Sequence, residues 1–234
     1  MATKASKIES AEVVEGSTRI HVDVMRMRSR KRTCSVYVKD DGKVIVKCPV
    51  TMTWDNINRF LDNKHDWIVS HYLETQSRKD EYRDILDLKA IMVNGKTVPL
   101  VFGPNPGIYM NRIEIRTKDD ISKLFINEFG YKLIDFAMGL ALRLGACPTS
   151  INVKGYKSRW GCCNSDGDIY LNYVLAMLPR EEQELVIIHE LCHLLYMNHS
   201  ADFHAQLDKW YPDNRRVQKK LNSYSFLLRF YNSM

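Results

Sequence analysis

The chain has 234 residues, of which 45% are hydrophobic and 26% are charged, so it can bury one large core or two small ones. No apolar run approaches the roughly 20 residues that span a bilayer, and the polar first fifteen residues lack the basic start and apolar run of a secretory signal. These features predict a globular cytoplasmic protein and argue against membrane-spanning and exported classes.

Six cysteines are scattered along the chain and include no Cys-x-x-Cys pair, which favours reduced thiols over a disulfide framework. Cys162 and Cys163 are adjacent and were considered as metal ligands. A structural zinc site needs two further partners at suitable spacing, so these two thiols are not assigned to a metal.

Basic residues are concentrated between positions 17 and 50, where nine Lys or Arg stand against three Asp. In the run VMRMRSRKR the arginines alternate with other residues, so on a strand their guanidinium groups would project from one face. The four arginines are Arg26, Arg28, Arg30 and Arg32. This cationic stripe is expected either to contact nucleic-acid phosphates or another acidic surface, or to form a solvated sheet edge whose charges discourage strand pairing.

The first half of the chain carries signals for strands and one helix. Two short β-branched runs flank the turn at residues 40–42 and predict a hairpin. Thr53 can cap a helix whose apolar residues recur at helical spacing, and the polar residues 75–84 mark a possible boundary. A second hairpin is predicted around residues 94–95, and a short strand is predicted at residues 112–117.

The second half begins with an amphipathic pattern that predicts a long helix from residue 119 to residue 146, interrupted near Gly130. Two strands at residues 151–156 and 168–174 are expected to form a hairpin. Pro179 then begins a helix whose first turns are acidic, as the helix dipole favours.

The helix that follows Pro179 contains the stretch VIIHELCHLLYMNHSADFH. His189 and His193 are four residues apart, so they lie on one face, where two imidazoles can bind one metal ion. Zinc bound in this way lowers the pKa of its water to about 7, and the carboxylate of Glu190 can accept the proton as hydroxide attacks a carbonyl. The motif therefore predicts a zinc hydrolase with Glu190 as general base.

A third metal ligand is needed, and the chain contains no glutamate after Glu190. His199 is the leading candidate, but on a continuous helix it would lie about 15 Å along the axis from His189. The helix must therefore end first. We expect the break at residues 197–198, where an asparagine tolerates the left-handed conformation that ends helices, with Ser200 able to start the next helix.

A family resemblance is carried by the run KSRWGCCNSDGDIYLNYVLAMLPREEQELVIIHELCHLLYMNHSADF. It resembles the YgjP-like metallopeptidase family, whose pattern is a KSRWGSC segment, an I-x-L-N strand, HELxH and NHSxxF. Weaker similarity extends over roughly residues 17 to 222 and is least recognisable between residues 75 and 125. Cys162 stands in place of the family's serine, and His204 stands in place of an aromatic residue.

The resemblance implies a zinc-dependent peptidase of the zincin type, related to the SprT and Spartan-like proteases that act on proteins attached to DNA. It supports His189, His193 and His199 as ligands and Glu190 as the catalytic base. One Zn²⁺ per chain is the expected cofactor, although three neutral nitrogen ligands also accept Co, Ni or Mn.

Two further residues are candidates for substrate or oxyanion contacts. Arg159 in the KSRWG segment either lines a cleft beside an extended peptide or pairs with an acid that supports the site. His204 either orients the substrate or the transition-state oxyanion, or has a packing or surface role. Trp160 is expected to pack against the histidine helix.

The expected architecture is α+β. It comprises a polar tail at residues 1–16, a β-rich basic region with one helix at residues 17–118, and a helical zincin-type metallopeptidase portion with a short sheet at residues 119–234. The expected reaction is peptide-bond hydrolysis of a protein or peptide substrate. Three alternatives remain open: a nucleic-acid-binding adaptor with a structural zinc, a DNA-associated protease, and a zinc hydrolase of a non-peptide amide.

Overall fold

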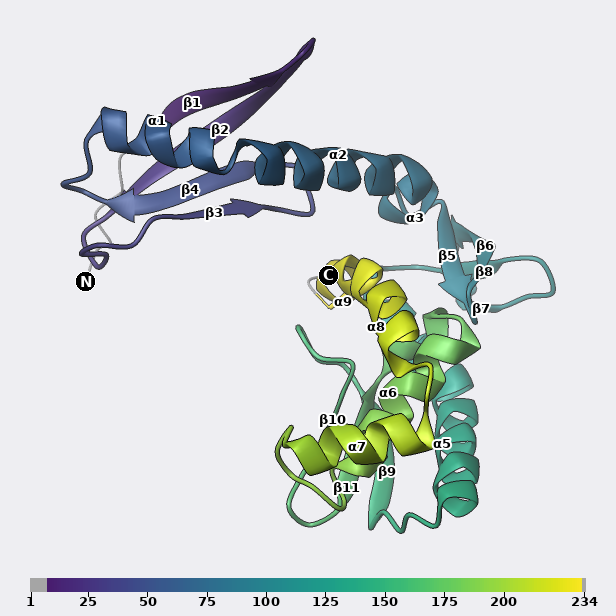
Figure 1. Cartoon of the computed structure of the whole chain (residues 1–234). Helices are drawn as coiled ribbons and strands as arrows, with labels where there is room; N and C mark the ends of the chain where they lie inside the picture. The colour runs from purple at the N-terminus through teal and green to yellow at the C-terminus, as the bar shows by residue number, and fades with distance from the viewer. Residues whose placement is uncertain (1–7, 233–234) are drawn as a thin grey trace. The chain divides into compact units, whose positions relative to one another are not determined.

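The computed structural model describes residues 8–232 and divides into two compact units at residues 83 and 84 (Figure 1). The division lies within the polar segment 75–84. Residues 84–118, which the sequence analysis groups with the basic region, belong to the second unit. Residues 8–15 of the expected polar tail form a strand, and residues 1–7 lie outside the described part. Both units contain helices and strands, so the α+β class is confirmed.

The first unit is a four-stranded sheet with helices packed on one face (Figure 1). The strand order is β1-β2-β4-β3, with β2 and β4 parallel and the other neighbours antiparallel. Its elements are β1 (Ile8–Glu15), β2 (Thr18–Met27), β3 (Ser35–Val38), β4 (Val44–Pro49), α1 (Trp54–Asn63) and α2 (His65–Glu81). Alternate valines of the central strands pack against apolar residues of the two helices, because one face of a strand repeats every second residue.

Local signals in this unit behave as the sequence predicts. The turn at residues 40–42 joins β3 and β4 as a hairpin, with Gly42 at φ +84°. Thr53 caps α1, since its hydroxyl accepts a hydrogen bond from the backbone N–H of Asn56 at 3.4 Å. The single helix expected after Thr53 is two helices that meet at Lys64, and the second one runs on to Glu81.

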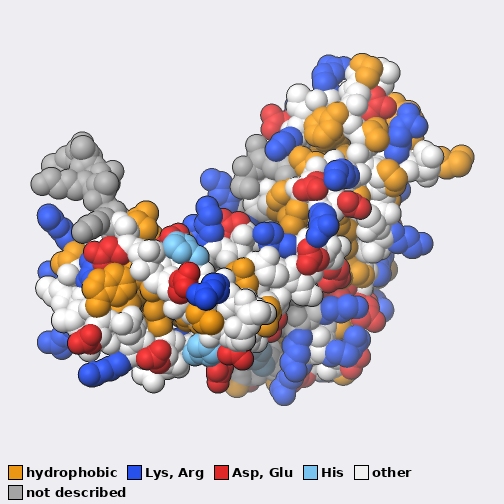
Figure 2. Space-filling view, turned by 90° about the horizontal axis from the view of Figure 1, so that it is seen from above, with side chains coloured by type: hydrophobic (Ala, Val, Ile, Leu, Met, Phe, Trp, Pro, Cys, Tyr) orange, Lys and Arg blue, Asp and Glu red, His pale blue; other side chains and the backbone are white. Residues whose placement is uncertain are grey.

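The predicted arginine stripe is wrong in its geometry, because β2 ends at Met27 and the later arginines lie in the loop that follows. The loop residues are Arg28, Arg30 and Arg32. Arg26 lies on the strand, but its Nε donates to the Glu9 carboxylate at 2.8 Å and its side chain is only 15% exposed. On the face shown in Figure 2, Lys and Arg side chains are interspersed with Asp and Glu rather than gathered into one patch.

The second unit has two small sheets and several helices. The first sheet has the order β5-β6-β8-β7 and contains β5 (Ala90–Val93), β6 (Lys96–Phe102), β7 (Gly107–Ile108) and β8 (Ile113–Ile115). The second has the order β10-β11-β9 and contains β9 (Ser150–Lys154), β10 (Gly161–Cys163) and β11 (Asp168–Asn172). The helical segments are α4 (Asp119–Leu124), η1 (Phe125–Phe129), α5 (Gly130–Leu144), η2 (Tyr173–Met177), α6 (Arg180–Cys192), α7 (Ala201–Trp210), α8 (Asn214–Ser223) and α9 (Ser225–Tyr231), and a short α3 (Arg83–Leu86) lies at the division.

Turn and helix signals are confirmed here too. Asn94 and Gly95 both have positive φ, as a type I′ hairpin turn requires, and they join β5 to β6. The long helix expected from residue 119 is interrupted by a π-helical turn at Phe125–Phe129 and ends at Gly145, where φ is +67°. None of the helices in the described part of the chain has the length and apolar character needed to cross a membrane.

The strand pairing before the histidine helix differs from the prediction. β9 and β11 were expected to form a hairpin, but they pair in parallel, and the hairpin is formed by β10 and β11. The three-residue β10 is too short to give a periodicity signal. The crossover before it is held by Asn172, whose side-chain amide donates to the backbone carbonyls of Tyr156 and Arg159. The strand β10 is therefore placed at the edge of the sheet, where it contacts α6.

Candidate metal centre

Helix α6 supplies the first two histidines of the site. It begins after Pro179 and has Glu181 in its first turn, as predicted, but it ends at Cys192, earlier than the expected break at residues 197–198. The next residues tighten into i→i+3 hydrogen bonds, such as the bond from the N–H of Leu194 to the carbonyl of Leu191 at 3.1 Å. The early end lets the chain turn back toward the helix within a few residues.

Three imidazoles converge after this turn. The Nε2 atoms of His189 and His199 are 3.0 Å apart, and one nitrogen from each of His189, His193 and His199 lies within 4.8 Å of the others. Zinc bonded to imidazoles at about 2.0–2.1 Å in a tetrahedral site places their nitrogens roughly 3.4 Å apart. The three side chains therefore fit a single metal ion with a fourth position left open.

Each of these ligands is oriented by a neighbouring group. Nδ1 of His193 lies 3.0 Å from the backbone carbonyl of Tyr196, so Nδ1–H donates there and Nε2 is left to bind a metal. Ser200 caps α7, as predicted, by accepting from the N–H of Phe203 at 3.3 Å. The fully buried Phe203 ring has its centroid 4.7–4.9 Å from all three imidazole rings and forms the floor of the site.

The environment keeps the histidines neutral, which is the form that binds metal. Burial, followed by the neighbouring histidines, lowers the pKa of His189 to about 4. Burial and the same neighbours also lower the pKa of His199. Both imidazoles are therefore unprotonated at neutral pH before any metal arrives.

Glu190 lies beside the ligands in a cradle formed by β10. Its side chain is buried, with 6% of the residue exposed, and this burial raises its pKa to about 8. The positive charge of Arg159 and the backbone N–H of Cys163 act in the opposite direction and favour the carboxylate. Gly161 leaves room for the carboxylate, because a Cβ there would lie 2.8 Å from Cγ and 2.9 Å from Oε1 of Glu190.

A comparison with protein families identifies the chain's relatives. The family model described as YgjP-like, metallopeptidase domain matches residues 32–224. The chain belongs to the YgjP-like metallopeptidase family. This finding confirms the resemblance inferred from the KSRWG, HELxH and NHSxxF segments.

Among solved structures, the crystal structure of the metallopeptidase zymogen of Pyrococcus abyssi abylysin is similar to part of this YgjP-like chain. The two are 22% identical, the match covers 42% of this chain and 96% of that chain, and the TM-score is 0.37. None of the curated proteins that were compared matches the chain.

Several other predicted residues of this YgjP-like metallopeptidase can now be placed. Arg159 forms no ion pair with an acid among the described residues, and it lines a cavity together with Trp160 and Glu190. Trp160 shares that cavity with residues of α6, next to the helix it was expected to contact. His204 lies outside the three-histidine group, with its ring centroid 6.4 Å from that of His199.

The cysteines of the KSRWGCC segment are separate from the metal group. The Cys162 thiol lies 3.1 Å from the hydroxyl of Tyr156, and burial raises the pKa of Cys163 to about 11. All six cysteines are free thiols, as the sequence indicates.

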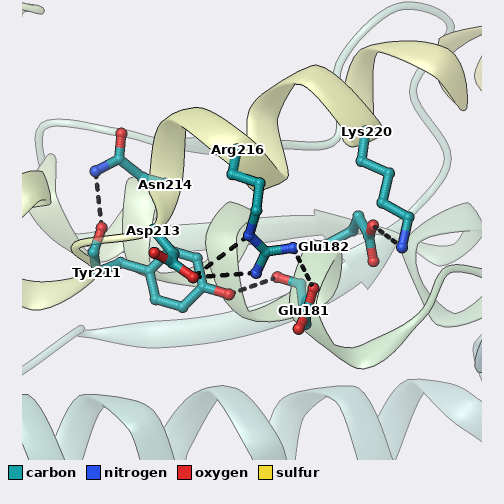
Figure 3. A network of polar contacts seen from close by, with 7 residues as sticks. All are labelled: Glu181, Glu182, Tyr211, Asp213, Asn214, Arg216 and Lys220. Atoms are coloured by element: carbon teal, nitrogen blue, oxygen red, sulfur yellow. Dashed lines mark hydrogen bonds and ion pairs between the residues drawn. The ribbon is translucent and has the colours of Figure 1, made fainter.

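Helix α8 forms the wall of the site opposite β10 and is tied to the start of α6 by charged side chains (Figure 3). Arg216 of α8 donates to Glu181 at 3.2 Å and to Asp213 at 3.1 Å. Lys220 lies 3.9 Å from the buried carboxylate of Glu182. These pairs hold the helix that presents Gln218 and Leu221 to the cavity.

Two functional positions escaped the reasoning from residues. Phe203 and Gly161 are both part of segments quoted for the family resemblance, but an aromatic residue or a glycine carries no chemical signal of its own. The contacts of Phe203 with three imidazoles and the space that Gly161 leaves for Glu190 depend on chain folding. Conserved spacing in related sequences is the signal that could have identified them.

Replacing His199 with Ala is expected to weaken metal binding by more than the roughly 10–100-fold that loss of an outer-shell partner costs, because one of three direct ligands is removed. Isothermal titration of metal-free protein with Zn²⁺ measures the change. His204→Ala is the matched control and should leave the affinity within about twofold. Equal weakening in both variants would contradict the assignment of the three ligands.

Proposed function

We propose that this YgjP-like metallopeptidase hydrolyses peptide bonds with one zinc ion bound by His189, His193 and His199, and with Glu190 as general base. The observation that carries the proposal is the convergence of three oriented, neutral imidazoles beside a buried carboxylate. Zinc is proposed because three nitrogen ligands with an open fourth position are typical of catalytic zinc sites.

Zinc at this position would polarise the scissile carbonyl and lower the pKa of a bound water. Glu190 accepts the proton of the attacking water and passes it to the leaving amine. Its burial makes it a stronger base than a solvated glutamate, while Arg159 and the N–H of Cys163 favour the ionised form that can accept a proton.

Arg159 and His204 are the proposed contacts for the substrate or the developing oxyanion. Arg159 lines the same cavity as Glu190 and His189, and His204 lines a second cavity that also includes His189. A cation beside the reacting carbonyl stabilises negative charge that develops in the transition state.

The proposal is tested by elemental analysis of the purified protein followed by digestion of an unfolded protein such as casein. We expect about one zinc per chain, with digestion that disappears in Glu190→Gln while the zinc content stays unchanged. Zinc-loaded wild type that cleaves neither casein nor a varied peptide mixture would refute the peptidase assignment.

A second candidate function, contact with nucleic acid, is supported by the basic loop that follows β2. Arg28, Lys31 and Arg32 are exposed there, whereas Arg26 is engaged by Glu9 and is the weakest of the four original candidates. If the loop binds phosphates, DNA affinity should fall steeply with salt, and changing Arg28, Arg30 and Arg32 to Ala should reduce both affinity and the salt slope. Binding that is unchanged by these substitutions would exclude this role for the loop.

A further inference from the structure

Two cavities of different chemistry adjoin the metal centre and share His189 and Gln218. The first, which we call the apolar pocket, has a volume of about 260 Å³. The second, which we call the charged pocket, has a volume of about 480 Å³. A peptide whose scissile bond lies at the metal would therefore meet different surroundings on the two sides of that bond.

The apolar pocket is formed by three separate elements. Trp160 precedes β10, Leu185 and Val186 come from α6, and Leu221 comes from α8. Its polar lining residues, besides His189 and Glu190, are Arg159 and Gln218, and both are exposed. Since Glu190 lies in the wall, a group bound in this pocket is next to the reacting atoms.

The charged pocket contrasts with it. Asp208 and Arg215 form an ion pair at 3.5 Å, and the buried Asn214 donates to Asp208 at 2.7 Å. His204 and Leu207 complete the lining that is not shared with the apolar pocket. An apolar side chain placed here would displace water from charged groups without replacing their hydrogen bonds.

The size of the apolar pocket limits what it can hold. Pockets for drug-sized ligands are about 300–1,000 Å³, so the apolar pocket is suited to one side chain rather than to a longer segment. We infer that it determines specificity by taking a large apolar side chain, such as Leu, Met or Phe, from the substrate residue next to the scissile bond. This inference rests on the proposed peptidase function and names its substrate class.

The experiment uses peptides that differ only at the residue next to the cleaved bond, with Leu, Phe, Ala, Asp or Arg at that position. Burying a large apolar side chain predicts that kcat/KM for Leu and Phe exceeds that for Ala by about 10- to 100-fold. Highest activity with Asp would show that Arg159 sets the preference, and equal activity with all five would show that the pocket is unused. Either result overturns the inference while leaving the peptidase function intact.

Enlarging the pocket should move the preference. Leu221→Ala is expected to favour Trp or Tyr over Leu, and Val186→Ala provides a second variant if Leu221→Ala does not fold. Val217→Ala is the matched control, because Val217 is buried on the same helix but does not line the pocket. A preference that is unchanged in both pocket variants, or shifted equally in the control, would overturn the assignment.

A binding measurement separates this inference from the proposed function. Zinc-loaded Glu190→Gln protein is titrated calorimetrically with the same peptides. The inference predicts that Leu and Phe peptides bind more tightly than Ala and Asp peptides. If this order is found while the wild type cleaves none of the peptides, the pocket stands and the peptidase function fails, whereas an order without apolar preference refutes the pocket.

Discussion

Replacing Glu190 with Gln should stabilise the metal-free protein by about 4 kcal/mol at pH 8 and by under about 1 kcal/mol at pH 5. Burial raises the carboxyl pKa to about 8 in the folded state, against 4.5 for an unperturbed glutamate. Between these two values the folded state holds a proton that the unfolded state releases. Wild-type stability therefore falls as pH rises through this window, and a glutamine removes the dependence.

Urea unfolding of metal-free wild type and Glu190→Gln at pH 5, 6, 7 and 8 measures the effect. Glu181→Gln is the matched control, because Glu181 is an exposed residue on the same helix and its replacement should give no such growth with pH. Added Zn²⁺ should narrow the gap, since a nearby cation favours the ionised carboxylate. A difference between wild type and Glu190→Gln that is constant with pH would contradict the burial of this group.

Gly161→Ala is expected to lower kcat by about 100-fold or more while zinc affinity changes little. The added Cβ would lie 2.8 Å from Cγ and 2.9 Å from Oε1 of Glu190, so the carboxylate must move. A displacement on the order of 1 Å of a catalytic group can cost about 100-fold in rate. The metal ligands come from α6 and the segment before α7, so the substitution does not touch them.

Peptide hydrolysis and Zn²⁺ titration of the same preparation separate these effects. Gly139→Ala is the matched control, because a Cβ there meets no atom within 4 Å and the residue lies in α5, where alanine stabilises a helix. Full activity in Gly161→Ala would show that β10 does not position Glu190. Loss of zinc together with activity would instead place Gly161 in support of the ligands.

Much of the local structure follows from nearby residues. The turns at residues 40–42 and 94–95 form hairpins, Thr53 and Ser200 cap helices, and the helix after Pro179 begins where its acidic first turn indicates. Each of these signals acts over a few residues, through backbone conformation or a single hydrogen bond. The exact end of α6 was predicted less well, because several competing turn conformations are available after Cys192.

The sequence by itself determined the candidate ligands, the candidate base and the family, because helical spacing places His189 and His193 together and the third ligand must follow a break. Tertiary structure alone decided the parallel pairing of β9 with β11, the placement of β10 beside Glu190, the contact of Phe203 with three imidazoles and the apolar pocket. These features join residues that are distant along the chain. Their formation depends on packing and loop closure across the whole unit, which no local pattern encodes.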